Sequence, residues 1–338
     1  MLNRVTFILA AVALTLSLLA GCAKTYDPAA RSEIRFVAGS ALLRDDATKA
    51  SATLKTSFGN GDYFKVFARR NNVSSSPVFT GETVSTTDGS SWSYSPERFW
   101  CWNSLADYYD FVAVYSQGTV SVMDISGNIA VKASYSVGTD NFDLMMATVR
   151  RLGTDQDCYE PVRITFRHVL SAVQVNIDNV SKNASLTLDD YHFENLISSA
   201  DAKVAVNPSG DGEYSWINTS SSSSAIGGET PGTPVTVNAE SRRDGDVELF
   251  VPQALDEAAG TGGKPKLVLH YTPYGGAQQT VEIELYTIKK GDKTPITSWE
   301  MGVKYTYNIQ IRIGGGVQVT LITTDWDEQE ASTPGILI

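Results

Sequence analysis

The stretch YTYNIQIRI, Tyr305 to Ile313, decides the fold class of this chain. Every odd-numbered position in it is apolar or aromatic and every even-numbered position is polar, which is the period of a β-strand with one buried and one solvated face. Gly314 to Gly316 interrupts the pattern, and Val317, Val319 and Leu321 then resume it, as expected for a hairpin.

Similar alternation recurs along the chain, at Val112–Tyr115, Val162–Ile177, Asp246–Val251, Lys266–Tyr271 and Thr280–Ile288. No stretch of ten or more residues combines a helical apolar stripe with a helix cap. The sequence therefore predicts an all-β protein, built from antiparallel sandwiches with Greek-key connections.

Within Val162–Ile177, the apolar residues change from even-numbered to odd-numbered positions, which is a change of parity. Ile164 and Phe166 are even-numbered, whereas Val173 and Val175 are odd-numbered, so one extra residue must be absorbed by a bulge or by a bend between sheets. His168 lies at this break. Because no second histidine or carboxylate accompanies it at useful spacing, we expect a hydrogen-bonded structural histidine and not a ligand or a general base.

The length of 338 residues favours two domains. The polar segment Arg150–Val162, which contains Gly and Pro, separates two strand-rich halves. The predicted division is an N-terminal sandwich at 50–157 and a C-terminal sandwich at 158–338.

Residues 1–21 have the pattern of a lipoprotein signal peptide. The apolar run Val5–Leu19 follows Arg4, ends at the small pair Ala20–Gly21, and is short for a hydrocarbon core of about 30 Å. Leu-Ala-Gly-Cys at its end resembles a bacterial lipobox, in which the cysteine, here Cys22, is acylated and becomes the first residue. The absence of an aspartate after Cys22 favours the outer membrane. The alternative is an ordinary export signal with a chance cysteine.

Composition restricts the partners of the chain. A formal charge of −11, with no Lys/Arg cluster longer than a pair, argues against nucleic acid. Apart from Cys22, the chain has Cys101 and Cys158, which could pair in an oxidising compartment, and the sequence leaves this question open.

Catalytic and metal-binding patterns are not found in the sequence. There is no GxSxG, HExxH, P-loop or strand-associated GxGxxG, so we expect neither an enzyme nor a cofactor. His168, His192 and His270 are too scattered to suggest a metal site, and the prediction is that none exists. Calcium at DDYHFEN (189–195) stays open as an alternative, although this stretch lacks a spaced ligand loop.

Several stretches, in their order and spacing, together resemble the fimbrillins, outer-membrane lipoprotein precursors that polymerise into type V pili of Gram-negative anaerobes. The most telling is Phe-x-His-x-Leu-Ser at Phe166–Ser171. The others are SEIRFVAG (32–39), ATKA (47–50), YYDFVAVY (108–115), DNFDLMMA (140–147), LFVPQAL (249–255), GVKYTYNIQI (302–311) and TTDW (323–326).

The resemblance implies two tandem transthyretin-like Greek-key sandwiches and a structural or accessory pilus subunit that serves adhesion. Its partners would be other pilus subunits, the outer membrane through lipid on Cys22, and a trypsin-like processing protease. The protease would remove residues 22–49 with the first strand, leaving a groove for a strand of the next subunit. The candidate cleavage residues are Arg44 and Lys49. The family prefers arginine, so Lys49 departs from its pattern.

The first strand suits this role, because Ile34, Phe36 and Ala38 share one face and would fill the groove before cleavage. The donor strand is less clearly marked. One candidate is the apolar carboxyl terminus, at Ile336, Leu337 and Ile338, and the alternative is Val317–Thr324.

A different function would suit the same fold, namely a surface lipoprotein module that binds glycans, for example, and does not polymerise. Sugar faces stack on exposed aromatic rings. This alternative is favoured if Trp92, Trp216 or Trp299 lies exposed in a loop, and the competing expectation is that they are buried in the core.

Overall fold

The computed structural model describes residues 32–40, 55, 57–71, 77–103, 107–125, 127–140, 142–229, 234–256, 263–290 and 294–325. Strands dominate these residues, and their only helical element is the 3₁₀ turn η1 (Leu285–Thr287). The all-β prediction is confirmed. In the described part of the chain, no helix has the length and apolar character needed to cross a bilayer.

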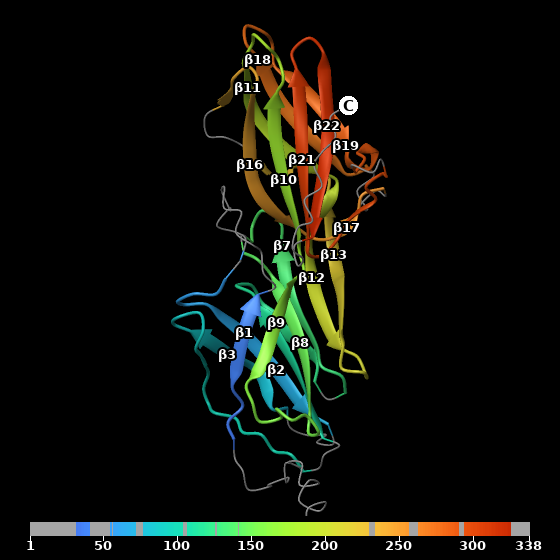
Figure 1. Cartoon of the computed structure of the whole chain (residues 1–338). Coiled ribbons are helices and arrows are strands. Elements are labelled where there is room, and N and C mark those ends of the chain that lie inside the picture. The colour runs from blue at the N-terminus through green and yellow to red at the C-terminus, as the bar shows by residue number, and fades with distance from the viewer. Residues whose placement is uncertain are drawn as a thin grey trace, which may run out of the picture.

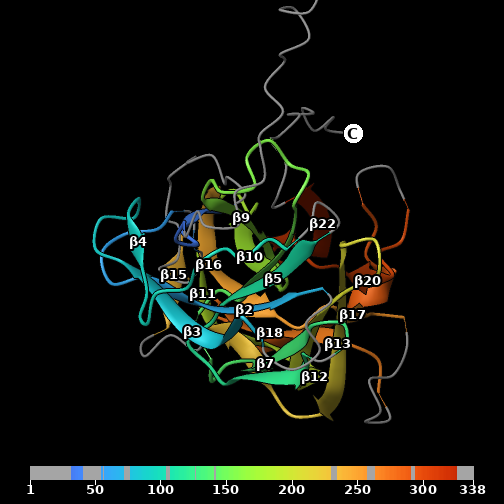
Figure 2. The ribbon, with the colours of Figure 1, turned by 90° about the horizontal axis from the view of Figure 1, so that it is seen from below.

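Two sandwiches follow one another along the long axis of the molecule, the N-terminal one at the bottom of Figure 1 and the C-terminal one at the top. In the view from below, strands of the N-terminal sandwich lie in front of those of the C-terminal sandwich (Figure 2). The described fold is therefore elongated, with two cores in line.

The N-terminal sandwich contains one large sheet and one smaller sheet. The large sheet consists of β1 (Phe36–Ser40), β2 (Tyr63–Arg70), β3 (Phe79–Thr86), β4 (Trp92–Ser93), β5 (Tyr108–Tyr115), β8 (Met145–Leu152) and β9 (Val162–His168). Its order is β1-β9-β8-β5-β2-β3-β4. The smaller sheet consists of β6 (Val120–Asp124), β7 (Ala130–Ser136), β12 (Leu196–Val206) and β13 (Gly212–Ser222), in the order β13-β12-β7-β6.

Both faces of the large sheet are buried at its centre. On β5, Val112 and Val114 point toward the smaller sheet, whereas Tyr109 and Phe111 point to the opposite side. That side is enclosed by the sheet itself, because the residues before β1 bridge to Phe99 beyond β4. We call the enclosed set the aromatic core; its buried aromatic members are Phe36, Phe64, Phe79, Trp100, Trp102, Tyr109, Phe111, Tyr115 and Phe166.

The C-terminal sandwich also has two main sheets. One consists of β10 (Ser171–Asn179), β16 (Ser241–Phe250), β21 (Val303–Arg312) and β22 (Gly316–Asp325), in the order β16-β10-β21-β22. The other consists of β11 (Leu186–Glu194), β14 (Ile226–Glu229), β18 (Lys266–Pro273) and β19 (Gln279–Glu284), in the order β14-β11-β18-β19, with β15 (Val235–Val237) also on β11. A short pair, β17 (Gln253–Ala254) with β20 (Ser298–Trp299), lies beside them.

The strand predicted at Tyr305–Ile313 forms β21 and buries its apolar face as the alternation predicts, whereas Asn308 on the polar face is also buried and accepts a hydrogen bond from Asn176. Tyr305, Tyr307, Ile309 and Ile311 are buried between the two sheets of the C-terminal sandwich. β21 and β22 pair as an antiparallel hairpin around the glycines, which confirms the predicted hairpin.

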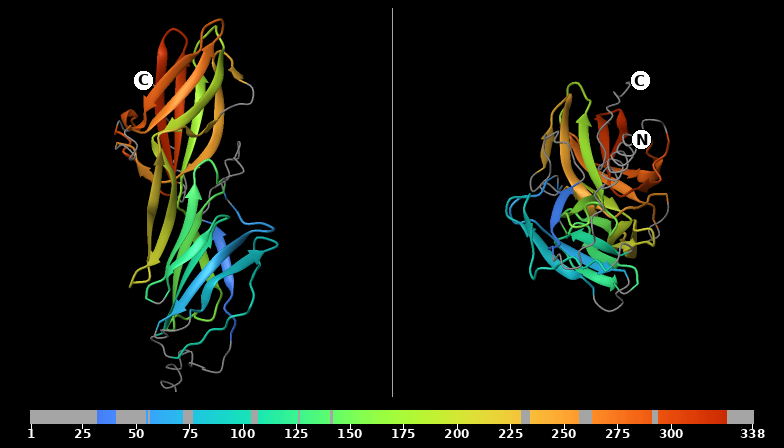
Figure 3. Two further views of the ribbon diagram at one scale, coloured as in Figure 1. Left: turned by 180° about the vertical axis from the view of Figure 1, so that it is seen from behind. Right: turned by 60° about the horizontal axis from the view of Figure 1, so that its bottom comes forward.

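The chain crosses between the sandwiches three times, from β9 to β10, from β11 to β12 and from β13 back to β14. β9 belongs to the N-terminal sandwich and β10 to the C-terminal one, with only Val169 and Leu170 between them. This is the bend between sheets that the parity change predicts. The second crossing is at Asn195, between β11 and β12, where φ is 60°. Figure 3 shows the β12–β13 hairpin, in yellow, running along the N-terminal sandwich.

The expected division at 157/158 does not follow these sheets. β9, β12 and β13 come after residue 158, yet they pair with strands of the N-terminal sandwich. The polar segment near Arg150–Val162 marks a turn between β8 and β9 within one sheet. A polar segment indicates that the chain turns there, but it does not indicate which strands pair on either side of the turn.

Candidate assembly site

The first strand has backbone partners on two sides. β1 pairs in parallel with β9, from Phe36 opposite Val162 to Ser40 opposite Phe166. Just before β1, the Ile34 amide donates to the Arg98 carbonyl (2.8 Å), and the Trp100 amide donates to the Ser32 carbonyl (2.9 Å). Residues 32–40 therefore lie in a seat made by β9 and the segment at 98–100.

The side chains of this strand alternate as predicted. Ile34 is 0% exposed and Phe36 is 4% exposed, and Ala38 is half-buried against the aromatic core. Arg35 and Val37 point outward. Burying one large apolar side chain contributes about 1.5–3 kcal/mol, so Ile34 and Phe36 together stabilise the bound position of the first strand substantially.

Phe36 lies at the centre of an aromatic cluster. Its ring centroid is 5.5 Å from that of Phe79, 5.6 Å from Tyr94, 6.0 Å from Phe111 and 6.1 Å from Phe64, all in edge-to-face arrangements. Such pairs are favourable beyond the area that they bury. Without β1, these four rings would lose a shared neighbour.

Tyr94 ties the strand to the opposite wall of the seat. Its hydroxyl donates to the Ile34 carbonyl at 2.6 Å and accepts the Arg98 amide at 3.2 Å. Burial raises the pKa of Tyr94 to about 12. The hydroxyl therefore stays neutral and able to donate at physiological pH.

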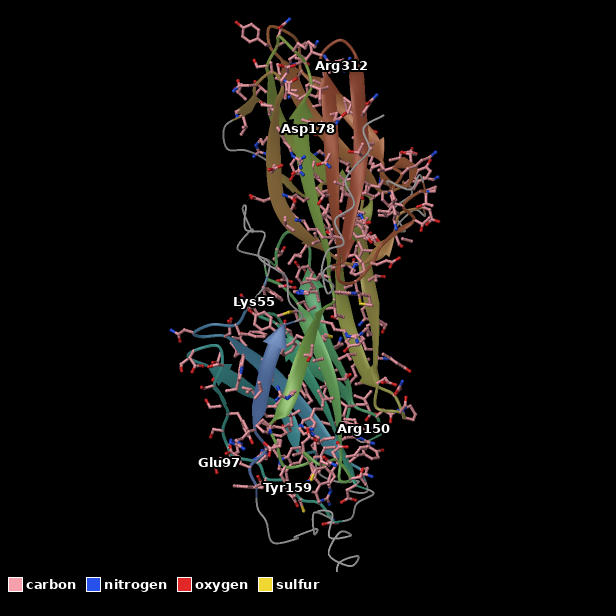
Figure 4. All side chains as sticks on the ribbon, in the orientation of Figure 1. Lys55, Glu97, Arg150, Tyr159, Asp178 and Arg312 are labelled. Carbon is pink, nitrogen blue, oxygen red and sulfur yellow. The ribbon has the colours of Figure 1, made fainter. Side chains whose placement is uncertain are left out.

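A buried ion pair stiffens the sheet beyond the seat. Arg150 on β8 donates to both carboxylate oxygens of Asp110 on β5, at 2.6 and 3.0 Å, and the Asp110 side chain is 2% exposed. Arg150 also donates to the Pro208 carbonyl at 2.7 Å, which fastens the turn between β12 and β13 to the sheet (Figure 4). Hydrogen bonding to Asp110 raises the pKa of Arg150.

His168 has the structural role that the sequence predicts. Its Nδ1 is 2.8 Å from Oδ2 of Asp143, and neither side chain is exposed. The same oxygen accepts the Lys55 amide at 3.1 Å. The sequence gives no signal of this carboxylate, because tertiary folding brings it to His168 from the segment before β8.

Some predicted site residues lie outside the described residues. They are Cys22, Arg44, Lys49, Ile336, Leu337 and Ile338. The alternative donor, Val317–Thr324, lies within β22, the last strand of its sheet.

β22 is only partly covered on its inner face. An open groove of about 820 Å³ runs between β19 and β22, and its apolar lining includes Val281, Ile283, Val317, Val319 and Leu321. Val317 and Val319 are half-buried and Ile322 is 55% exposed. β22 has one ladder, with β21, and a single bridge from the buried Leu321 to Lys290 on its other side. An edge strand of this kind costs less to displace than a central strand.

The three tryptophans singled out by the sequence are packed against the cores. Trp299 is 1% exposed and donates from Nε1 to the Tyr307 hydroxyl at 2.8 Å. Trp216 and Trp92 are half-buried, and Trp216 donates to the Val169 carbonyl at 3.2 Å. None of the three is an exposed stacking platform, so they give the glycan-binding alternative no support.

The two cysteines inside the fold are not joined by a disulfide. Cys101 is exposed, and Cys158 is buried in the aromatic core. The pairing that the sequence left open is not formed in this structure.

The structure also places His192 beside His270. Their ring centroids are 5.8 Å apart across β11 and β18, and Asp190 lies next to both. The description of the three histidines as scattered is therefore wrong for His192 and His270, whereas the expectation of no metal site stays a prediction at this point. The sequence gives no signal of the contact, because it depends on the pairing of two strands that are distant along the chain.

Comparison with known proteins identifies the family. Residues 48–326 match the family described as Fimbrillin-like. No curated protein matches the sequence.

Several solved structures are similar to this chain in fold. A proposed cell adhesion protein from Bacteroides uniformis is 19% identical over 89% of this chain and 100% of its own, with a TM-score of 0.50. A fimbrial protein from Bacteroides vulgatus is 14% identical over 78% of this chain and 92% of its own, with a TM-score of 0.49. The tip fimbrial protein Mfa3 from Porphyromonas gingivalis, truncated at its carboxyl terminus, is 12% identical over 79% of this chain and 95% of its own, with a TM-score of 0.39. On the family match over most of its length, the chain belongs to the fimbrillin-like family.

Proposed function

We propose that this protein is a structural or accessory subunit of a type V, fimbrillin-type pilus that serves adhesion, a role that requires no catalysis and no cofactor. The observation that carries the proposal is the seat of the first strand. Residues 32–40 fill the aromatic core, and the segment that joins them to the rest of the chain contains Arg44 and Lys49. Membership of the fimbrillin-like family supports the same role.

Cleavage after Arg44 or Lys49 would leave the first strand held by noncovalent contacts alone. Its departure would uncover the Phe64, Phe79 and Phe111 rings and the backbone groups of β9. A strand from another subunit that carries two apolar side chains at alternate positions would restore both the burial and the ladder. Assembly is then strand exchange, driven by the same contacts that hold β1.

Two segments are candidates for the donated strand. The carboxyl terminus offers Ile336, Leu337 and Ile338, a short apolar run at the end of the chain. β22 offers Val317, Val319 and Leu321, and its position at a sheet edge beside an open groove supports its release.

Membrane attachment is part of the proposal. Lipid on Cys22 would hold the precursor at the outer membrane, where other pilus subunits and a trypsin-like protease would be its partners. Cys22→Ser should then release the protein from the membrane fraction, and loss of the lipid should be visible in the intact mass. Unchanged membrane association of the variant would contradict the lipid anchor.

The strand-exchange step can be tested with trypsin. The purified protein is cleaved, and the product is run unboiled on a denaturing gel, where strand-exchanged oligomers should form a ladder. The double variant Arg44→Gln/Lys49→Gln should give no ladder under the same conditions. A stable cleaved monomer would refute polymerisation while leaving the fold unaffected.

A peptide competition makes the test specific to the seat. A synthetic peptide of residues 32–40 in excess should suppress the ladder, because it can refill the groove in place of a donor strand. The matched control is the same peptide with Ile34→Ala and Phe36→Ala, which should not suppress it. Equal suppression by both peptides would rule out the seat of β1 as the exchange site.

A further inference from the structure

The outer face of the C-terminal sandwich carries a polar cluster that the assembly role does not use. β11 contributes Asp190 and His192, and β18 contributes His270. The nitrogen and oxygen atoms that these three side chains can offer to a metal all lie within 4.8 Å of one another. The side chains are 21–30% exposed, so an ion can reach them from solvent.

A β-bulge places this cluster on one face. Leu188 and then Tyr191 and Phe193 point into the core, so the inward parity changes between residues 188 and 191. The register of β11 with β18 shifts at the same point, where Asp189 is the extra residue. As a result, Asp190 and His192 both point outward, and Asp190 lies directly opposite His270.

The distances suit a small tetrahedral ion. Nδ1 of His270 is 2.7 Å from Oδ1 of Asp190, and Nδ1 of His192 is 3.6 Å from the same oxygen. Zinc binds histidine nitrogen and carboxylate oxygen at about 2.0–2.2 Å, which puts neighbouring ligand atoms of a tetrahedron roughly 3.3 Å apart. The observed spacings lie on either side of that value, so small side-chain rotations would form the site.

A carboxylate also orients one of the histidines from behind. Nε2 of His192 is 3.3 Å from Oε1 of Glu194, and Glu194 is held by Lys266 at 3.1 Å. In metal sites, a ligating imidazole usually gives its other N–H to such a carboxylate, which sets the ring orientation. His192 would therefore present Nδ1 toward Asp190 and His270.

We propose that Asp190, His192 and His270 bind one zinc ion, or a similar late first-row divalent cation, with water in the fourth position. Two imidazoles and one carboxylate select such ions over calcium and magnesium, which prefer oxygen ligands. The bound ion would join β11 to β18 on the outside of the sandwich.

Zinc titration of the full, untagged chain by calorimetry tests the site. One ion should bind per chain, and cobalt in place of zinc should give the intense visible absorption of a tetrahedral centre. His192→Gln and His270→Gln should each abolish binding. The matched control is Asp189→Asn, the neighbour whose carboxylate accepts hydrogen bonds from other residues on the sheet and which should bind like the parent chain.

Glu194→Gln provides an independent test, because Glu194 would contact His192 and not the metal itself. It should weaken binding by about 10–100-fold without abolishing it. Far-UV circular dichroism checks that each variant is folded. Absence of stoichiometric zinc binding by the parent chain, or zinc binding by either histidine variant as tight as that of the parent chain, would overturn the proposal.

Discussion

Replacing Phe36 by alanine tests how strongly the first strand is held. The substitution removes a ring that is 4% exposed and that meets four other aromatic rings at centroid distances of 5.5–6.1 Å. Truncating a buried phenylalanine costs about 3–5 kcal/mol, partly from lost transfer energy and partly from the cavity left behind. We expect about 4 kcal/mol, because three of the four neighbouring rings, Phe64, Phe79 and Phe111, belong to strands of one sheet and can close the gap only in part.

The matched control is Val37→Ala on the same strand. Val37 is 41% exposed and points away from the aromatic core, so its truncation should change the free energy of unfolding by no more than about 0.5 kcal/mol. Both variants keep the backbone pairing of β1 with β9. The difference between them therefore isolates side-chain burial in the seat.

Urea unfolding followed by tryptophan fluorescence is the assay. Trp100 and Trp102 stack at 5.3 Å within the aromatic core, so their emission reports this sandwich. In thermal unfolding, a loss of about 4 kcal/mol corresponds to a fall in Tm of roughly 8–16 °C for a domain of this size. A loss below about 1 kcal/mol for Phe36→Ala, or one no larger than that of Val37→Ala, would refute the reasoning that β1 is a core strand.

Two further predictions concern the supports of the N-terminal sandwich. Arg150→Ala leaves the Asp110 carboxylate buried without its main partner and should cost about 3 kcal/mol in urea unfolding, whereas Arg242→Ala, at an exposed ion pair, should cost less than about 1 kcal/mol. Burial raises the pKa of Tyr94 from about 10 in the unfolded chain to about 12 in the fold. Its contribution to stability should therefore be constant below pH 10 and fall as the pH rises through 12. Urea midpoints measured from pH 9 to 12 should fall less steeply for Tyr94→Phe than for the parent chain, and equal slopes would contradict this assignment.

The sequence predicts well which side chains of a strand face inward, and it predicts poorly which strands pair with one another. Ile34 and Phe36 point inward as their alternation requires, and the parity break at His168 is a bend between sheets. The predicted division at 157/158 does not follow the sheets, because β9, β12 and β13 pair with earlier strands. The reason is that alternation records burial along one strand, whereas pairing depends on contacts between distant parts of the chain.

The same limit applies to the polar clusters. The contact of Asp143 with His168 and the contact of Asp190 with His270 each join side chains that are far apart along the chain. A change of one residue in strand register would turn either partner to the other face. No spacing within the sequence records that register.

The sequence by itself determined that this protein is all-β, which side chains face inward on the strands that alternate clearly, and that the strand parity breaks near His168, because apolar side chains must leave water wherever they occur. Only the tertiary structure decided that residues 32–40 lie between β9 and the segment at 98–100, and that His192 meets His270. Those contacts follow from long-range strand pairing and from one bulge in β11. The need to bury an apolar strand face does not specify them, because several different neighbouring strands could bury that face equally well.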